Sequence, residues 1–297
     1  MIERRLSLRG RETLAGLAFL APSLTLFSVF VYYPLLATAY NSLTKWNIVS
    51  PVQPFVGLAN YVRLTEDQRF IAALTNTAVY SIGVVGSGMV LGLALGLLLN
   101  RRMVARGLYR TVLFAPFVTS LSAMALLWTW IFDRQFGLVN SFLRALSLPA
   151  PGWLSSTDWA LPAIMIMALW HSLGYSTVIF LVGLQNVPAE LVEAAKLDGA
   201  TGVRLFWRIT LPLLSPTTFF LLVTGLIASF QVFDAVAVMT QGGPLDATTV
   251  LVFYIYQSAF RFFEMGYASA IAMVLFLIVV TLTAAQLMAS RRWVHYG

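Results

Sequence analysis

Cysteine is absent from this 297-residue sequence, and lysine is nearly absent. Without cysteine, the chain has no disulfide, no cysteine metal ligand and no thiol nucleophile. The two lysines, Lys45 and Lys196, follow Thr and Ala, whereas a phosphate-binding P-loop needs Gly directly before its Lys. HExxH and GxSxG patterns are missing as well. We therefore expect no ATP hydrolysis by this chain, no metal site and no other catalytic constellation.

Charged residues are also scarce, at 10% of the chain, while 59% of the residues are hydrophobic and the mean hydropathy is +0.81. This composition is typical of an integral membrane protein and lies far from that of a soluble domain. A helix needs about 20 apolar residues to cross a bilayer. Six charge-free stretches are long enough, which predicts an all-α membrane protein with spans at 13–44, 70–100, 111–132, 159–189, 209–233 and 265–290.

Two apolar segments need separate treatment. The first span follows several arginines, as a signal peptide would, but it is far longer than the roughly 7 to 15 apolar residues of a signal, and no small-x-small cleavage site closes it. It is therefore kept as a span. The stretch VLVFYIYQSAF at 250–260 is too short to cross the membrane and predicts a re-entrant or an interfacial helix.

Basic residues are distributed unevenly across the membrane. With the N-terminus inside, 13 of the 19 Lys and Arg residues fall in inner segments, including the turn NRRMVARGLYR at 100–110. The bias predicts a membrane protein with cytoplasmic tails at 1–12 and 291–297 around a membrane domain at 13–290. It also explains the net charge of +7 without a nucleic-acid partner.

Glycine is spaced regularly in the second span. Gly88, Gly92 and Gly96 recur every fourth residue and so share one face of a helix. Small residues in this pattern let two helix backbones approach closely in lipid. The span is expected to pack against another helix, either of the same chain or of a second subunit.

The inner segment at 190–216, ELVEAAKLDGATGVRLFWRITLPLLSP, mixes acids with bases. Pro188 and the first-turn acids favour a helix at about 188–198, and Gly199 suits the left-handed residue that ends it. A second amphipathic turn leads into the fifth span. With three acids and three bases between 190 and 208, the segment lacks the basic face of a helix that rests on lipid headgroups. We therefore favour a rigid projection that docks onto a protein, and we name residues 188–208 the knob.

The same segment carries a resemblance to a known family. EAA, then Gly199 after three residues, then Ile209, Leu211 and Pro212, reproduces the cytoplasmic EAA signature of binding-protein-dependent ABC importer permeases. The stretches FVGLANYVRL, YRTVLFAPFVTS, LVGLQNVPAELVEAAKLDGAT and TQGGPLDATTVLVFYIYQSAF also resemble the sugar-type branch, which is similar to the maltose and glycerol-3-phosphate permeases.

The resemblance implies a type I importer transmembrane domain whose coupling loop, 185–213, docks on a separate ATPase. The ATP and Mg²⁺ would be bound by a dimer of those ATPase subunits, so this chain would hold no cofactor. A second homologous permease subunit and an extracytoplasmic solute-binding protein are the other implied partners, beside membrane lipid. The residues implied in ATPase coupling are Glu193, Ala194, Ala195, Asp198 and Gly199.

Polar side chains within the spans gather at two places, WHSLGYST in the fourth span and SFQVFD at the end of the fifth. Hydroxyl and amide groups there could bind a polyhydroxylated solute in a translocation cavity, or could join neighbouring helices by hydrogen bonds. Asp234 could instead hold a loop at the membrane interface. The candidates for the solute path are His171, Tyr175, Thr177, Ser229, Gln231 and Asp234.

The sequence thus predicts one permease subunit of an ATP-driven importer that moves a di- or oligosaccharide or a polyol by alternating access. An importer of glycerol-3-phosphate or a phosphodiester is an alternative, although no basic cluster lies within the spans. A secondary transporter driven by an ion gradient is a second alternative. It would need charged coupling groups or repeated broken helices, and neither is evident in the sequence.

Overall fold

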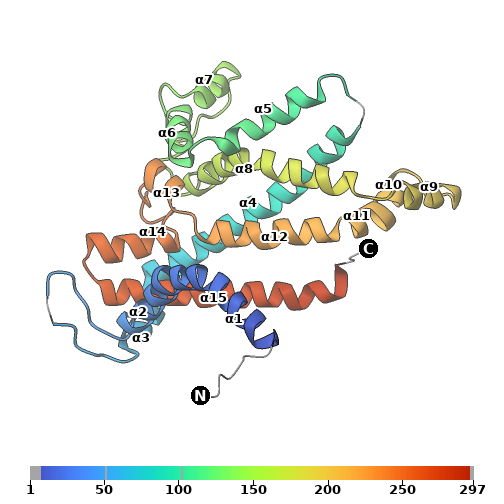
Figure 1. Cartoon of the computed structure of the whole chain (residues 1–297). Coiled ribbons are helices and arrows are strands. Elements are labelled where there is room, and N and C mark those ends of the chain that lie inside the picture. The colour runs from blue at the N-terminus through green and yellow to red at the C-terminus, as the bar shows by residue number, and fades with distance from the viewer. Residues whose placement is uncertain (1–7, 51, 102, 295–297) are drawn as a thin grey trace.

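The computed structural model describes residues 8–50, 52–101 and 103–294, which form an elongated helical bundle (Figure 1). Across these residues the regular structure is helical, apart from one isolated β-bridge between Thr44 and Phe55. Short helices gather at one end of the bundle, and α9 (Ala189–Leu197) and α10 (Gly202–Leu205) project from the other. The prediction of an all-α chain is confirmed.

Four helical segments are long and apolar enough to cross a membrane as single rods. The first, Ala15–Asn41, combines α1 (Leu8–Phe27), the π-helical turn η1 (Ser28–Tyr32) and α2 (Tyr33–Asn41). The others are α4 (Gln68–Asn100), α8 (Ala160–Gln185) and α15 (Met265–Trp293). These four correspond to the first, second, fourth and sixth predicted spans.

The third and fifth predicted spans are bent. Residues 111–132 divide between α5 (Arg106–Val118) and α6 (Leu121–Ile131), which meet at 98°. Thr119 and Ser120 have extended backbones between them, just after Pro116, so the helical hydrogen bonding stops there. The predicted span at 111–132 is thus a bent pair of helices.

The fifth span begins beyond the end of the knob. One rod, Gly202–Leu213, comprises α10, η2 (Phe206–Thr210) and α11 (Leu211–Leu213). Helix α12 (Ser215–Phe230) follows it at an angle of 63°. Pro212 and Pro216 flank the bend, and Leu214 between them is fully buried. The straight rod within 209–233 is thus shorter than the charge-free stretch.

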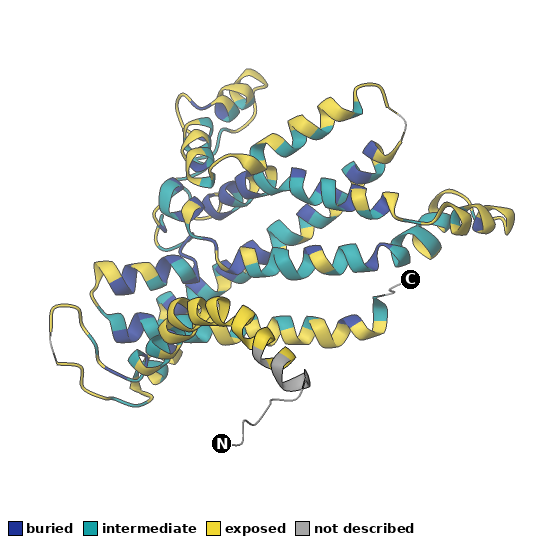
Figure 2. Cartoon of the chain, viewed as in Figure 1, coloured by how far each residue is buried: buried dark blue, intermediate teal, exposed yellow. Residues whose placement is uncertain are grey.

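Helix α8 lies at the centre of the bundle and packs against α4, α5 and α12 (Figure 2). A Cβ atom added to Gly92 of α4 would lie 2.8 Å from Ser176 Cβ, and one added to Gly96 would lie 3.2 Å from Phe180 Cβ. The predicted close packing of α4 is confirmed, and its partner is α8 of the same chain. At Gly174 of α8, an added Cβ would lie 1.8 Å from the backbone oxygen of Leu113, so α5 also packs closely.

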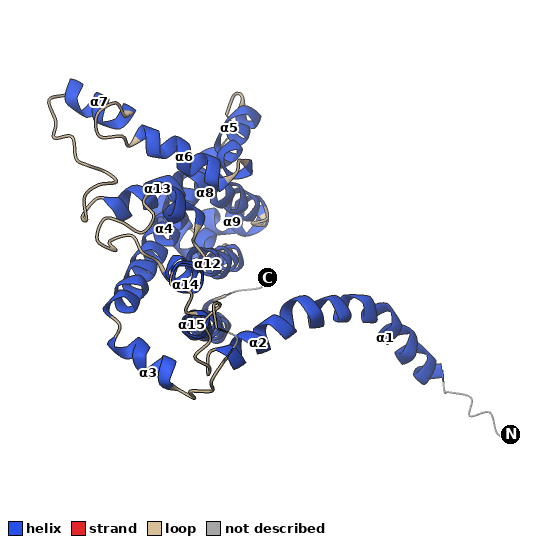
Figure 3. Cartoon of the chain, turned by 90° about the vertical axis from the view of Figure 1, so that its left-hand side faces the viewer, coloured by secondary structure: helices blue, strands red, loops and turns tan. Residues whose placement is uncertain are grey.

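Helix α1 extends away from the bundle (Figure 3). None of the residues in the most apolar 18-residue window of Ala15–Asn41 is buried. Only the end of this rod is held, where α2 packs against α15. Among the described residues, none therefore covers the lateral surface of this apolar window.

Short helices occupy the end of the bundle opposite the knob: α3 (Ala59–Glu66), α7 (Leu138–Ala145), α13 (Asp234–Met239) and α14 (Leu251–Tyr256), which continues into η3 (Gln257–Arg261). The stretch 250–260 is helical, as predicted. Val250, Leu251 and Phe253 are buried, and α14 packs against both α4 and α15. Both the re-entrant and the interfacial alternative stay predictions.

The structure describes part of each predicted tail. Helix α1 already begins at Leu8, and residues 1–7 of the predicted tail lie outside the described residues. Helix α15 continues to Trp293, and residues 295–297 lie outside the described residues. Helical structure therefore extends into both segments, and the boundaries of the membrane domain stay a prediction.

Candidate translocation cavity and coupling knob

A cavity of about 430 Å³ lies among α4, α8, α12 and the bend between α5 and α6. Five of the six predicted solute-path residues line it: His171, Tyr175, Ser229, Gln231 and Asp234. They come from two segments that lie far apart in the sequence, and the packing of α12 against α8 brings these together. The role of these residues in transport stays a prediction.

One wall of the cavity is aromatic. The ring of Phe117, at the end of α5, stacks on that of Tyr175 with centroids 4.7 Å apart and planes inclined by 18°. It also contacts the ring of His171 at 5.9 Å. The Nε2 atom of His171 lies 3.3 Å from the backbone oxygen of Thr119 in the α5–α6 bend. The sequence did not single out Phe117, because its ring meets Tyr175 and His171 only through the packing of α5 on α8.

The opposite wall carries the polar groups from the end of α12. Ser229 is largely buried and donates to the backbone oxygen of Leu226 at 2.9 Å, so its hydroxyl is already engaged. Gln231 and Asp234 are exposed and follow the last turn of α12. Ser122 donates to Asp234 Oδ1 at 3.3 Å. This bond joins α6 to α13, which agrees with the loop-holding alternative for Asp234.

Thr177 is the exception among the predicted solute-path residues. It is fully buried and donates to the backbone oxygen of Leu173 at 2.8 Å, and it lies where α8 meets Gly92 and Gly96 of α4. Residues 171 and 175 are four apart and share a helix face, whereas 177 is two residues further and points elsewhere. The prediction that Thr177 faces the cavity is therefore wrong, and the alternative of helix packing applies to it.

The cavity lining contains few charged residues. Within the described part of the chain, its lining residues include one carboxylate, Asp234, and neither lysine nor arginine. The other polar groups are hydroxyls, an amide and an imidazole. The cavity therefore offers hydrogen bonds and aromatic surfaces, without a fixed positive charge.

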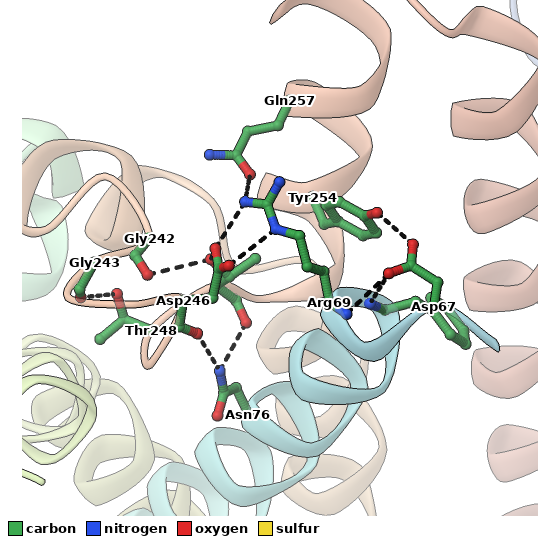
Figure 4. Close-up of polar contacts among 11 residues, drawn as sticks. Asp67, Arg69, Asn76, Gly242, Gly243, Asp246, Thr248, Tyr254 and Gln257 are labelled. Carbon is green, nitrogen blue, oxygen red and sulfur yellow. Dashed lines mark hydrogen bonds and ion pairs between the residues drawn. The ribbon is translucent and has the colours of Figure 1, made fainter. Parts of the chain in front are cut away.

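A second polar group, which we name the outer clasp, joins the start of α4 to the loop at 240–250 (Figure 4). Arg69 donates from Nε to Asp246 Oδ2 at 2.9 Å and from Nη2 to Oδ1 at 2.7 Å. Two turns further along α4, Asn76 donates to the backbone oxygens of Asp246 and Thr249, both at 3.0 Å. The hydrogen bonds with Arg69 lower the pKa of Asp246 below its ordinary value, although partial burial raises it.

Asp67 extends the clasp as the N-cap of α4. Its Oδ1 accepts from the backbone N–H groups of Arg69 and Phe70, and its Oδ2 accepts from the hydroxyls of Tyr254 and Tyr267. Partial burial raises the pKa of Asp67, but the four hydrogen bonds outweigh it and the pKa is lowered. Sequence reasoning missed the clasp because its partners lie nearly 200 residues apart and no local spacing records them.

The knob is built as predicted. Helix α9 begins after Pro188, and Gly199 has a φ of +82° directly after the C-cap Asp198. The N–H of Ala200 then bonds back to the oxygen of Ala195 at 2.8 Å, which closes the helix end. The glycine is needed here because other residues adopt this left-handed conformation at a cost.

The residues predicted to couple to an ATPase have different surroundings. Glu193, Ala194, Asp198 and Gly199 are exposed, whereas Ala195 is 9% exposed and faces the chain itself. A direct contact through Ala195 therefore does not fit the structure. Large apolar side chains are exposed on the knob beside the acids, namely Leu197, Val203 and Trp207.

Comparison with known proteins decides the family. A sequence model described as the binding-protein-dependent transport system inner membrane component matches residues 88–294. The chain belongs to this family. The permease is 37% identical over 273 residues to the probable ABC transporter permease protein YurN of Bacillus subtilis. The alignment covers 91% of this chain and 93% of YurN.

Two further relatives have named solutes. The permease is 34% identical to the sulfoquinovosyl glycerol permease SmoG of Agrobacterium fabrum, with 93% of this chain and 90% of the relative covered. It is 33% identical to the sn-glycerol-3-phosphate permease UgpA of the same organism, with 93% and 94% covered. The permease is thus similar along nearly its whole length to proteins of related transport systems.

The fold is also found among solved structures. A chain of the bacterial alginate ABC transporter, in complex with a periplasmic protein that holds an alginate pentasaccharide, superposes with a TM-score of 0.84. The two chains are 24% identical, and 97% of each is covered. The type I importer architecture expected from the sequence is therefore confirmed.

Proposed function

We propose that this permease forms one half of the pore of an ATP-driven importer and that its solute is a neutral carbohydrate or polyol. The cavity of about 430 Å³ carries the proposal. Its stacked Phe117 and Tyr175 can pack on the apolar C–H face of a sugar ring, while His171 and Gln231 can bond its hydroxyls.

The cavity charge supports a neutral solute over a phosphate ester. Sites for phosphate rely on Arg or Lys, whose forks or ammonium groups neutralise the anion. Asp234 would instead repel such a solute from the cavity. The name of UgpA states that it transports sn-glycerol-3-phosphate. We therefore infer that the present permease transports a different solute from this relative, although the two sequences are 33% identical.

The partners follow from the two ends of the molecule. The exposed acids and apolar residues of the knob suit a groove on a separate ATPase, which would bind ATP and Mg²⁺. A second permease subunit would close the cavity and cover α1. An extracytoplasmic solute-binding protein would deliver the solute at the opposite end, and both termini would lie in the cytoplasm.

Reconstituted transport tests the proposal. In proteoliposomes that contain the assembled importer and its binding protein, uptake is measured for neutral disaccharides, polyols and glycerol-3-phosphate. Tyr175→Ala and Gln231→Ala are each expected to lower uptake of a neutral solute about tenfold, the effect of losing roughly 1.4 kcal/mol. Thr177→Ser, which keeps the buried hydroxyl, should transport like the wild type. Preferred uptake of glycerol-3-phosphate would contradict the proposal.

The coupling role needs its own experiment. Glu193→Lys should release the ATPase during purification, or abolish solute-stimulated ATP hydrolysis, while the permease keeps its thermal stability. Lys196→Gln, a change in the same helix that leaves the acids intact, is the control. If uptake continues after ATP is depleted while ion gradients are clamped, the permease belongs to an ion-driven system and the importer mechanism fails.

A further inference from the structure

Two arginines of the inner turn converge on one side chain. Arg106 and Arg110 lie one turn apart at the start of α5, and Gln185 is the last residue of α8. With its amide oxygen turned toward them, Gln185 accepts from Arg106 Nη2 at 2.6 Å and from Arg110 Nη2 at 2.9 Å. Both guanidinium groups are thus within hydrogen-bonding distance of the same oxygen atom.

This arrangement leaves two positive charges without a counterion. In the ranges that the structure describes, no carboxylate lies within salt-bridge distance of either arginine. The Nε atoms of Arg106 and Arg110 are buried and have no hydrogen-bond partner. Arginine does not lose its proton in proteins, and one neutral amide oxygen cannot balance two guanidinium charges. The pair therefore lacks an anion.

The neighbouring side chains indicate what kind of anion fits. Leu108, Tyr109 and Val112 lie on the same turns of α5, and each is at least half exposed. A small soluble ion would leave these apolar surfaces uncovered.

 The aliphatic surface of Leu108 and Val112 suits acyl chains, and a tyrosine such as Tyr109 is common at the level of the lipid headgroups. The site thus combines two cations with an apolar surface, the two halves of an anionic lipid.

We infer that Arg106 and Arg110 bind the phosphate of an anionic phospholipid of the inner leaflet, with its acyl chains lying along α5. Arginine forks match phosphate oxygens, and basic pockets between helices at the cytoplasmic side are suited to lipid headgroups. The lipid would join the start of α5 to the end of α8 beside Gln185. The inner turn then holds a specific lipid, beyond setting the topology of the chain.

Lipid retention by the purified importer tests this site. The intact complex in detergent is mixed with phosphatidylglycerol or phosphatidylcholine, and bound lipid is counted by native mass spectrometry. Each arginine near an anionic lipid contributes about 1 kcal/mol, or about fivefold in affinity, so Arg106→Gln with Arg110→Gln should lower phosphatidylglycerol binding about 25-fold. Phosphatidylcholine binding should not change.

The matched control is Arg291→Gln with Arg292→Gln at the end of α15, which removes the same charge from the same side of the membrane. It should bind phosphatidylglycerol like the wild type. Equal losses in both double variants would reduce the effect to general surface charge and overturn the specific site. Loss of the ATPase from the Arg106/Arg110 variant, with lipid binding unchanged, would assign the pair to a protein contact and also overturn it.

Two measurements on the wild type keep the inference testable if the double variant fails to fold. The wild type should prefer phosphatidylglycerol to phosphatidylcholine, and absence of this preference contradicts the inference directly. Inorganic phosphate at the same concentration should displace little of the lipid, because it lacks acyl chains to contact α5. Full displacement would show that the site binds a free anion.

Discussion

The first span, Ala15–Asn41, which is built on α1 and α2, and helix α4 are both long and apolar enough to cross a membrane, yet their surroundings differ completely. In the most apolar window of α4, 28% of the residues are buried, whereas in that of the first span none is buried. Hydropathy therefore specifies which segments enter the bilayer, and it does not specify what covers them there. In lipid, apolar surface alone gives two helices little reason to associate.

Glycine accounts for much of the difference. Gly92 and Gly96 bring α4 so close to α8 that an added Cβ at either position would press on the neighbouring helix. Gly16 of α1 has nothing within 4 Å of its would-be Cβ. Close packing thus depends on small residues at repeated positions that meet a second helix, and α1 has no such neighbour in this chain.

The largest effect is expected where a glycine meets backbone. Gly174→Ala in α8 places a methyl group 1.8 Å from the oxygen of Leu113, and neither backbone can yield without moving α5. We expect a loss of about 3 kcal/mol in stability, the upper part of the range for overpacking. Thermal unfolding in detergent, followed by size-exclusion chromatography, measures it.

Gly86→Ala is the matched control for that change, because nothing lies within 4 Å of its would-be Cβ in α4. It should leave stability unchanged or raise it by at most about 1 kcal/mol, because alanine favours a helix over glycine. Equal unfolding temperatures for the two variants would mean that the close approach of α5 and α8 does not hold the bundle together.

A smaller effect is expected at the outer clasp. Arg69→Met removes the ion pair with Asp246, whose side chains are 37% and 33% exposed, so solvent screening limits the loss to about 1 kcal/mol. Arg144→Met is the control, because Arg144 bonds backbone oxygens of its own outer loop and has no carboxylate partner in the described residues. An equal change in unfolding temperature for both would leave the clasp without a specific role.

The clasp also predicts an acid dependence. The pKa values of Asp67 and Asp246 are lowered in the folded chain, so their contribution is fully present above the unfolded value of about 3.9. It is lost as the pH falls through the lower folded values. The stability difference between wild type and Asp246→Asn should therefore be constant from neutral pH to about 4 and shrink below it. A difference that vanishes already between pH 7 and 5 would contradict the lowered pKa.

Sequence reasoning reached the parts of this molecule that local patterns record. The span positions follow from runs of apolar residues, and the knob follows from Pro188, Gly199 and the charges between them. The pairing of α4 with α8 was predicted only in part. The glycine spacing indicated that α4 packs closely against a helix, but it did not indicate which one.

The features that could not be predicted from the sequence depend on contacts between distant segments. The bend at Thr119 and the stack of Phe117 on Tyr175 arise from how α5 packs on α8. Thr177 was misplaced because composition marks a residue as polar but does not say which helix face meets a neighbour. The clasp between Arg69 and Asp246 likewise exists only once the fold is formed.

The exposed side of α1 gives no effect in the isolated chain and a moderate one in the assembled importer. Phe19 is 86% exposed, so Phe19→Ala should not change the unfolding temperature of the isolated chain. If a second permease subunit covers α1, the loss of this ring should weaken the association of the two subunits about tenfold, a cost of roughly 1.4 kcal/mol. Pull-down of the partner subunit over a dilution series measures the change. Unaltered association would assign this face of α1 to lipid.

The smallest effect is expected at Gly16, where alanine makes the same chemical change as at Gly174. The added methyl group meets no atom within 4 Å, and alanine favours a helix by roughly 1 kcal/mol over glycine. Gly16→Ala should therefore leave the isolated chain unchanged or slightly more stable in thermal unfolding. A destabilisation as large as that of Gly174→Ala would mean that α1 packs closely against the bundle, and the contrast between α1 and α4 would then fail. A loss of stability that is seen only in the assembled importer would place the second subunit against this turn of α1. The difference between α1 and α4 would then be that α1 packs against another chain, whereas α4 packs within its own.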